Sequence, residues 1–120
     1  MHLYIMDQNG RQFAEAADRD PIRNTAEAND VLSFCFEHGT DRLLLYAENL
    51  PTGFFDLSTG AAGALLQRFR QYGLRVAVVW SPDVVKPTAR FAEMVAEENR
   101  GPFFRMYEER GAAEAWLLSS

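Results

Sequence analysis

The sequence predicts an α/β fold with a mostly parallel sheet of about five strands, an N-terminal hairpin and about four helices. Asn9-Gly10 is a two-residue turn signal between two short strand-like runs, which indicates the hairpin. Residues 43–46 and 76–79 are short apolar runs bounded by turn residues, as is typical of buried parallel strands. These runs alternate with amphipathic helical segments, and that alternation predicts βα units with right-handed crossovers.

Each element is expected from its own local pattern. Asn24 followed by Glu27 resembles a capping box at the start of the first helix, and glycines end the first three helices. The expected strands cover residues 2–6, 12–16, 42–47, 75–80 and 103–107. The expected helices run from Asn24 to Gly39, from the 58–61 region to Gly73, from Pro87 or Thr88 to residues 99–101, and over residues 108–118. The side chains expected to face the sheet are Ala28, Val31, Leu32, Cys35, Phe36, Ala62, Leu65, Leu66, Phe69, Tyr72, Phe91, Met94, Val95, Ala112, Ala115, Trp116 and Leu117.

Length and composition predict one domain spanning residues 1–120. The chain has 120 residues, 48% of them hydrophobic, with nine Phe and two Trp, so burial can offset chain entropy without a disulfide. Its single cysteine, Cys35, excludes an internal disulfide and favours a reducing, cytoplasmic location. Cys35 falls on the inner stripe of the first helix, where we expect it to act as a small hydrophobe.

Charge and hydropathy argue against nucleic-acid and membrane partners. The net charge is −5 and the arginines are dispersed, so the chain lacks the basic patch that phosphate backbones require. The N-terminus has no basic start followed by a long apolar run, and no later segment reaches a membrane-spanning length. His2 on a strand and His38 at a helix end do not suggest metal ligands, and no cofactor is expected.

The segment from Phe54 to Gly63 is the most informative stretch for function, because it joins a probable strand to a helix. Open parallel sheets place ligands outside the carboxyl ends of their strands, beside unpaired N–H groups of the following helix. The candidate docking or modification residues are therefore Asp56, Ser58, Thr59 and Gly60. Ser58 and Thr59 also have a structural interpretation as helix caps, and the two interpretations can coexist. Gly60 and Gly63 are expected to let the helix approach the sheet closely.

A second interpretation treats the same region as a ligand crevice formed by Glu48, Asp56, Gly63 and Trp80. Two carboxylates that converge there can shift each other's protonation and act as an acid/base pair. No Gly-x-Ser-x-Gly elbow surrounds Ser58 and no histidine is placed beside it, so a hydrolytic triad has no support. We therefore assign no catalytic residue and lean towards a protein that is not an enzyme.

The chain resembles a bacterial family of unknown function, family 4180, over most of its length. The motif with the most specific match runs through residues 54–72 as Phe-Phe-Asp-Leu, Thr-Gly, Ala-Gly, Leu-Gln, Phe and Tyr. The other matching segments are Glu48-Asn49-Leu50, Val76-Ala77-Val78-Val79, Glu98-Asn99-Arg100-Gly101 and Glu114-Ala115-Trp116-Leu117. A family without a known activity implies none for this chain.

The helix start Asp56-Leu57-Ser58-Thr59-Gly60 is also similar to the Asp-Ser-Ser-Gly helix start of STAS domains, the class of sulphate transporters and anti-sigma-factor antagonists. That resemblance implies a cytoplasmic regulatory module that docks a protein partner and is switched by phosphorylation of a hydroxyl before the glycine. Thr59 is the matching position, and one additional residue leaves Ser58 as the other candidate. The alternative is a small-molecule or phosphate-binding protein, or an enzyme, at the same crevice, and either module can form a homodimer.

Overall fold

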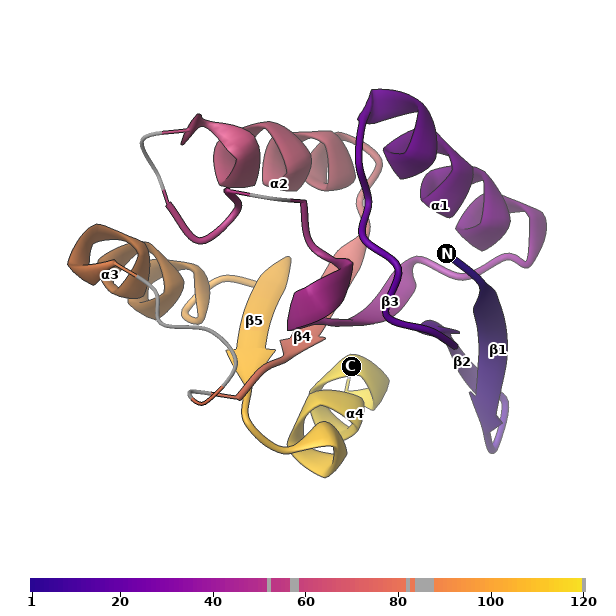
Figure 1. The fold of residues 1–120 in the computed structure, drawn as a ribbon. Helices are drawn as coiled ribbons and strands as arrows, with labels where there is room; N and C mark the ends of the chain where they lie inside the picture. The colour runs from indigo at the N-terminus through magenta and orange to yellow at the C-terminus, as the bar shows by residue number, and fades with distance from the viewer. Residues whose placement is uncertain (52, 57–58, 82, 84–87, 120) are drawn as a thin grey trace.

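A computed structural model describes residues 1–51, 53–56, 59–81, 83 and 88–119 and shows one five-stranded sheet with helices on both faces (Figure 1). The strands are β1 (Leu3–Gln8), β2 (Arg11–Ala16), β3 (Arg42–Tyr46), β4 (Arg75–Val79) and β5 (Phe104–Tyr107). The helices are α1 (Thr25–Glu37), α2 (Ala61–Gln71), α3 (Ala89–Glu98) and α4 (Arg110–Leu118), and a short 3-10 turn, η1 (Ala47–Asn49), follows β3. The strands lie in sequence order; β1 and β2 are antiparallel, and all later neighbours are parallel. The expected α/β class, hairpin and element order are confirmed.

The N-terminal hairpin forms because Asn9 and Gly10 both adopt positive φ angles, 56° and 84°. Such a turn matches the right-handed twist of the two strands. The Gly10 N–H donates to Asp7 Oδ1 at 2.9 Å, which closes the turn. The turn fixes the register of the hairpin and places Tyr4 directly opposite Glu15.

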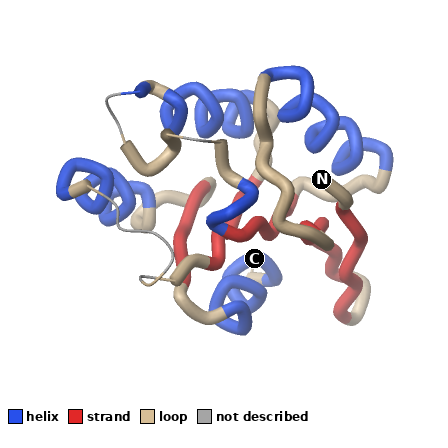
Figure 2. The backbone as a smooth tube through the Cα atoms, viewed as in Figure 1, coloured by secondary structure: helices blue, strands red, loops and turns tan. Residues whose placement is uncertain are grey.

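The sheet is covered unequally on its two faces, as the backbone tube in Figure 2 also shows. The larger core lies under α1, α2 and α3 and includes Leu43, Leu45, Phe54 and Phe91. A smaller core on the opposite face packs Ala113, Trp116 and Leu117 of α4 against Phe13, Leu44 and Ala77 of the sheet. The described part of the chain contains no helix long and apolar enough to cross a membrane.

Polar side chains cap the starts of α1 and α3. Asn24 Oδ1 accepts the Glu27 N–H at 2.9 Å, and Glu27 in turn accepts the Arg23 N–H at 2.7 Å. Thr88 Oγ1 caps α3 by accepting the Phe91 N–H at 3.2 Å. The helix expected to begin near Pro87 or Thr88 begins at Ala89, directly after Thr88, and Pro87 lies outside the described residues.

Two predicted inward-facing aromatic side chains are on the surface. Phe36 is 68% exposed and Tyr72 is 49% exposed, although each lies within a helical stretch of apolar residues. Four positions along a helix make one full turn plus about 40° of rotation. A side chain at the end of the inner stripe, such as that of Phe36, therefore points towards the neighbouring helix and away from the sheet. The expectation that Phe36 and Tyr72 pack on the sheet was therefore wrong.

In the last helix the predicted burial of Trp116 and Leu117 is confirmed, whereas that of Ala112 and Ala115 was wrong. Ala113, Trp116 and Leu117 are buried in α4, whereas Ala112 and Ala115 are exposed. The buried set has the i, i+3, i+4 spacing of a helix that begins at Arg110, which is later than residue 108.

Arginines from the sheet hold the C-terminal end of α4. Arg42 donates to the carbonyl oxygens of Leu117 and Ser119, Arg75 donates to Ser119 at 3.1 Å, and Arg11 donates to Leu118. The last carbonyls of a helix lack intrahelical partners and carry the negative end of its dipole. These dispersed arginines therefore share a structural role at one end of one helix.

Candidate functional site

The Thr59 hydroxyl adds side-chain hydrogen bonds to the backbone turns of the loop before α2. Thr59 Oγ1 donates to the carbonyl oxygens of Gly53 at 2.8 Å and of Asp56 at 2.9 Å, which share its single proton, and it accepts the Ala61 N–H at 3.2 Å. The Thr59 side chain also packs on Gly53, where a Cβ would come within 3.0 Å of its methyl group. Thr59 thus caps the first turn of α2 and holds the loop closed, while its side chain is on the exposed surface.

Gly60 and Gly63 have different backbone requirements. Gly60 is the residue that precedes α2, and its φ of 75° lies in the left-handed region that favours glycine. Gly63 lies in the first turn of α2 on an exposed face, and its φ is not positive. A Cβ at either position meets nothing within 4 Å, so the expectation that these glycines permit close helix–sheet packing was wrong.

The other predicted site residues have separate surroundings. Asp56 is exposed in the turn before α2, where its N–H donates to the Gly53 carbonyl at 3.0 Å. Glu48 lies in η1 and faces the Arg19 guanidinium at 4.0 Å. Trp80 follows β4 and packs against the larger core. Ser58 lies outside the described residues.

A surface cavity of about 190 Å³ lies beside this loop, between the N-terminal turns of α1 and α2. Its apolar wall includes Pro51, Ala61 and Leu65, and Arg23 and Arg68 stand at its rim. The cavity and the described residues of 53–63 together form what we call the α2 N-terminal surface. This surface combines a concave apolar floor, two basic side chains and an exposed hydroxyl.

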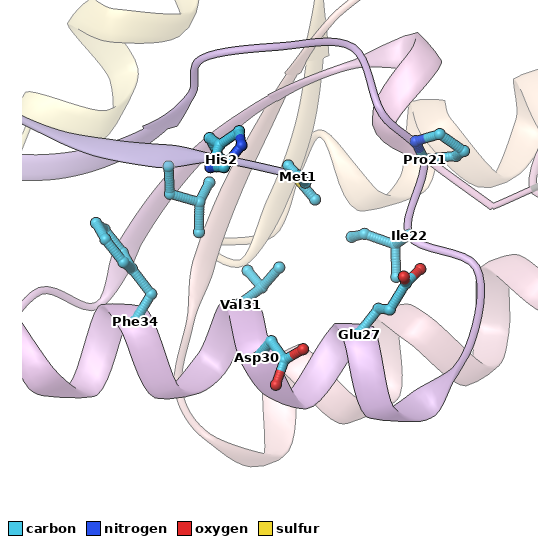
Figure 3. Close-up of a pocket in the computed structure, with 9 residues that line it drawn as sticks. Met1, His2, Pro21, Ile22, Glu27, Asp30, Val31 and Phe34 are labelled. Atoms are coloured by element: carbon cyan, nitrogen blue, oxygen red, sulfur yellow. The ribbon is translucent and has the colours of Figure 1, made fainter.

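A second cavity, of about 260 Å³, lies between the N-terminal strand and α1. Figure 3 shows Val31 and Phe34 rising from α1 towards that strand, with Ile22 on the opposite wall. Glu27 also lines this cavity, but its carboxylate is bound to the Arg23 N–H, and that hydrogen bond lowers its pKa. The cavity therefore presents an apolar floor beside an acidic group that already serves the α1 cap.

A buried polar cluster at the carboxyl ends of β2 and β3 was not foreseen from the sequence. Glu15 is only 3% exposed, yet it accepts hydrogen bonds from Arg110 and from the Tyr46 hydroxyl, the latter at 2.7 Å. Burial raises the pKa of Glu15, but the hydrogen bonds from Arg110 and Tyr46 together bring it below its ordinary value. Burial and the bond to Glu15 raise the pKa of the Tyr46 hydroxyl.

This cluster is a structural brace. Arg110 Nε and Nη2 both face Glu15, and Nη1 faces Glu114, so all three guanidinium nitrogens have a carboxylate partner. The arrangement ties the first residue of α4 to β2 and, through Tyr46, to β3. Because the Arg110 guanidinium nitrogens are bonded within the protein, the cluster anchors α4 to the sheet.

Asn49 forms a second buried brace next to Glu48. The Asn49 side chain is fully buried; its Oδ1 accepts the Tyr46 N–H at 2.9 Å, and its Nδ2 donates to the carbonyls of Asp18 and Asp20. The Ile22 N–H donates to the Asn49 carbonyl at 2.8 Å. Asn49 thereby fixes the segment that leads into α1, and Ile22 of that segment lines both cavities.

The protein is an α/β domain, and its most distinctive feature is the exposed loop of the α2 N-terminal surface. The family model described as Domain of unknown function (DUF4180) matches residues 8–117. The chain therefore belongs to the DUF4180 family. No curated protein matches it, and no solved structure does.

Proposed function

We propose that this chain is a non-catalytic, cytoplasmic regulatory module of STAS-like type that captures a protein partner at the α2 N-terminal surface. The single observation that carries the proposal is the Thr59 hydroxyl, which holds the loop closed through backbone carbonyls on an exposed surface. The hairpin followed by alternating helices and strands supports the STAS-like assignment. Asp56 and Gly60 contribute the turn geometry that positions this hydroxyl.

Phosphorylation of Thr59 provides a physical switch. A phosphate ester removes the hydroxyl proton that Gly53 and Asp56 accept, and it adds a charge of about −1.5 to −2. The charge is repelled by those two carbonyl oxygens and attracted to the N–H groups of the first α2 turn. The loop therefore opens while α2 remains stable, and the surface that a partner meets changes in both shape and charge.

The cavity beside the loop indicates the chemistry of the partner. Its floor of Pro51, Ala61 and Leu65 suits one apolar side chain, and the Arg68 guanidinium suits a neighbouring carboxylate, whereas Arg23 is already paired with Glu27 at 3.2 Å. A partner segment with an apolar anchor next to acidic residues fits both features. A phosphate on Thr59 adds negative charge near this site and disfavours such a segment.

The test compares partner capture by variants that separate loop opening from charge. Thr59→Asp supplies the charge, Thr59→Val removes the hydroxyl without adding charge, and Ser58→Asp tests the neighbouring hydroxyl. Each tagged variant is used in a pull-down from cells of the source, after circular dichroism has shown that it is folded. We expect reduced capture by Thr59→Asp and a smaller reduction by Thr59→Val. Unchanged capture by both Thr59→Asp and Ser58→Asp contradicts the proposal.

The second candidate function is a small-molecule or phosphate-binding protein at the same place. It is favoured by one observation, that two arginines line a cavity between the first turns of two helices. A ligand that binds only the native state must raise the melting temperature, so a thermal-shift screen with anions and nucleotides tests this candidate. A stabilising ligand whose effect disappears in Arg68→Gln supports it, whereas the absence of any shift contradicts it.

A further inference from the structure

Phe36 and Tyr72 form an exposed aromatic pair at the C-terminal ends of α1 and α2. Their ring centroids are 6.3 Å apart with an interplanar angle of 87°, which is an edge-to-face contact. Large aromatic side chains that gather on the surface of a soluble protein commonly mark an interaction site. Neither ring is needed to fill the core, because Leu32 and Phe69 do so one turn earlier.

The aromatic pair lies between two concave surfaces. One, of about 390 Å³, extends along α1 and α2 and is lined by Asn29, Leu32 and Ser33 on α1 and by Arg68 on α2. The other, of about 420 Å³, lies beyond the helix ends, where Gly39 and Leu74 contribute to its wall. We call the two surfaces and the aromatic pair between them the aromatic groove.

The first of these surfaces carries one basic and one acidic side chain, Arg68 and Glu37, that form no ion pair among the described residues. Arg68 Nε donates to Asn29 Oδ1 at 2.7 Å, which places the guanidinium towards the N-terminal part of α1. Glu37 is the last residue of α1, eight positions after Asn29, or about 12 Å along a helix. In the described part of the chain, the ion pairs include neither Arg68 nor Glu37. The first surface is therefore basic where Arg68 reaches Asn29 and acidic at Glu37, which adjoins the aromatic pair.

We propose that a second copy of this chain covers the aromatic groove, with the two copies related by a two-fold axis perpendicular to it. A two-fold axis brings the same surface of both copies together and reverses the direction of the groove. Arg68 of one copy then faces Glu37 of the partner subunit, and this pairing occurs twice. Because this pairing puts the axis midway between Arg68 and Glu37, the Phe36 and Tyr72 rings lie to one side of it, where the partner subunit covers them and removes their contact with water.

The size of the surface predicts a weak, reversible dimer. The 13 residues of α1 span about 20 Å, and two adjacent helices are about 20 Å wide, so each copy buries about 400 Å². That area is about half of the roughly 800 Å² per partner found in standard stable interfaces. We therefore expect dissociation constants in the micromolar to millimolar range.

Sedimentation velocity of the full chain, at concentrations from roughly 10 µM to 1 mM, tests the dimer directly. We expect a concentration-dependent rise in the weight-average mass, and we expect Phe36→Ser and Tyr72→Ser each to reduce the association constant severalfold or more. Tyr72→Phe keeps the ring and serves as the matched control that retains association. Because both side chains are exposed, the serine variants should keep the wild-type melting temperature.

Charge reversal tests the two-fold arrangement. Arg68→Glu places two acidic groups opposite each other in a homodimer, and Glu37→Lys places two basic groups there, so each variant alone should associate less than the wild type. An equimolar mixture should associate again, because one contact then joins the two introduced charges and the other joins the native Arg68 and Glu37. Glu93→Lys, an exposed reversal on α3, is the control that should leave association unchanged.

Three outcomes overturn this proposal. They are a wild-type protein that stays monomeric at the highest concentration, serine variants that associate as well as the wild type, and charge variants that fail to recover on mixing. Thr59 lies outside the aromatic groove, so Thr59→Asp should associate like the wild type. Arg68 lines both surfaces, so the two proposals are compared with Thr59→Asp and with the serine variants, all of which keep Arg68. Loss of partner capture with an intact dimer, or the reverse, therefore separates the two proposals.

Discussion

At the residue scale, Gly60 and Gly63 are three positions apart and are expected to respond in opposite ways to replacement by alanine. Gly63→Ala should raise the free energy of unfolding by about 0.5–1 kcal/mol, because a methyl group meets nothing there and alanine favours the helix. Gly60→Ala should lower it by about 1–2 kcal/mol, because the φ of 75° is strained for a residue with a Cβ. Urea unfolding of the two variants checks the pair, and destabilisation by Gly63→Ala would contradict the described helix start.

The sequence predicted that a hydroxyl would cap α2, and Thr59 does so by accepting the Ala61 N–H. It did not predict the two bonds that Thr59 donates back to the loop, because they depend on the turn formed by Gly53 and Asp56. A capping preference concerns the residues that follow in the chain, whereas the loop geometry depends on residues that precede it. The sequence also did not predict that Glu48 faces Arg19, from the segment between β2 and α1.

At the element scale, Asn49 connects β3, η1 and the segment before α1. Asn49→Ala should lower the free energy of unfolding by about 2–4 kcal/mol, because the fully buried Asn49 amide is the hydrogen-bond partner of backbone groups of Tyr46, Asp18 and Asp20. Hydrogen exchange should accelerate most at the Tyr46 amide. Asn29→Ala is the matched control, since the Asn29 side chain meets the partly exposed Arg68, and it should cost well under half as much. Equal losses for the two variants would contradict the brace.

Hydrophobic periodicity predicted the helices well and their exposed ends poorly. The buried residues of α1 include Ala28, Val31, Leu32 and Cys35, as expected, because these positions face the sheet along the length of the helix. The same pattern does not reveal where the covering surface ends, so Phe36 and Tyr72 were assigned to the core. Side chains at the rim of an apolar stripe can face either a neighbouring helix or solvent, and only the packing of two helices decides between them.

At the scale of the whole molecule, Glu15 and Arg110 join residues 95 positions apart. The hairpin turn sets the register that places Tyr4 opposite Glu15. This neighbour of Glu15 therefore follows from a turn that the sequence predicts. The contact between Arg110 and Glu15 depends on how all the intervening strands and helices are arranged and on the residue at which α4 begins. A long-range ion pair of this kind follows from the fold, and local patterns do not predict it.

This ion pair predicts a pH dependence of stability. The pKa of Glu15 in the folded state is below its ordinary value of 4.5, so the stability it contributes is present above that value and is lost as the pH falls through the folded-state pKa. Glu15→Gln should unfold about 2–3 kcal/mol more easily at neutral pH, an amount reduced by the partial exposure of Arg110. Urea unfolding of both proteins should show this difference shrink as the pH falls below about 4. A difference that stays constant on acidification would contradict the contribution of the Glu15 charge.

Cys35 reports on the unfolding of the larger core. It is buried, and burial, with a smaller effect of the Asp41 charge, raises the pKa of its thiol to about 12. The native protein should therefore resist labelling by a thiol reagent at mildly alkaline pH, and reactivity should appear with urea at the same midpoint as the circular-dichroism transition. Rapid labelling of the native protein would show that α1 opens separately from the sheet.

The most direct test of the Thr59 switch is site-specific photo-cross-linking from the α2 N-terminal surface. A photoreactive residue at Ala64, which lines the cavity, is compared with one at Ala96, an exposed position on α3. In cells of the source, Ala64 should give a discrete protein adduct that Ala96 does not, and Thr59→Glu should reduce its yield severalfold in a folded protein. Identical adducts from both positions, or a yield unaffected by Thr59→Glu, would contradict a partner surface controlled by this hydroxyl.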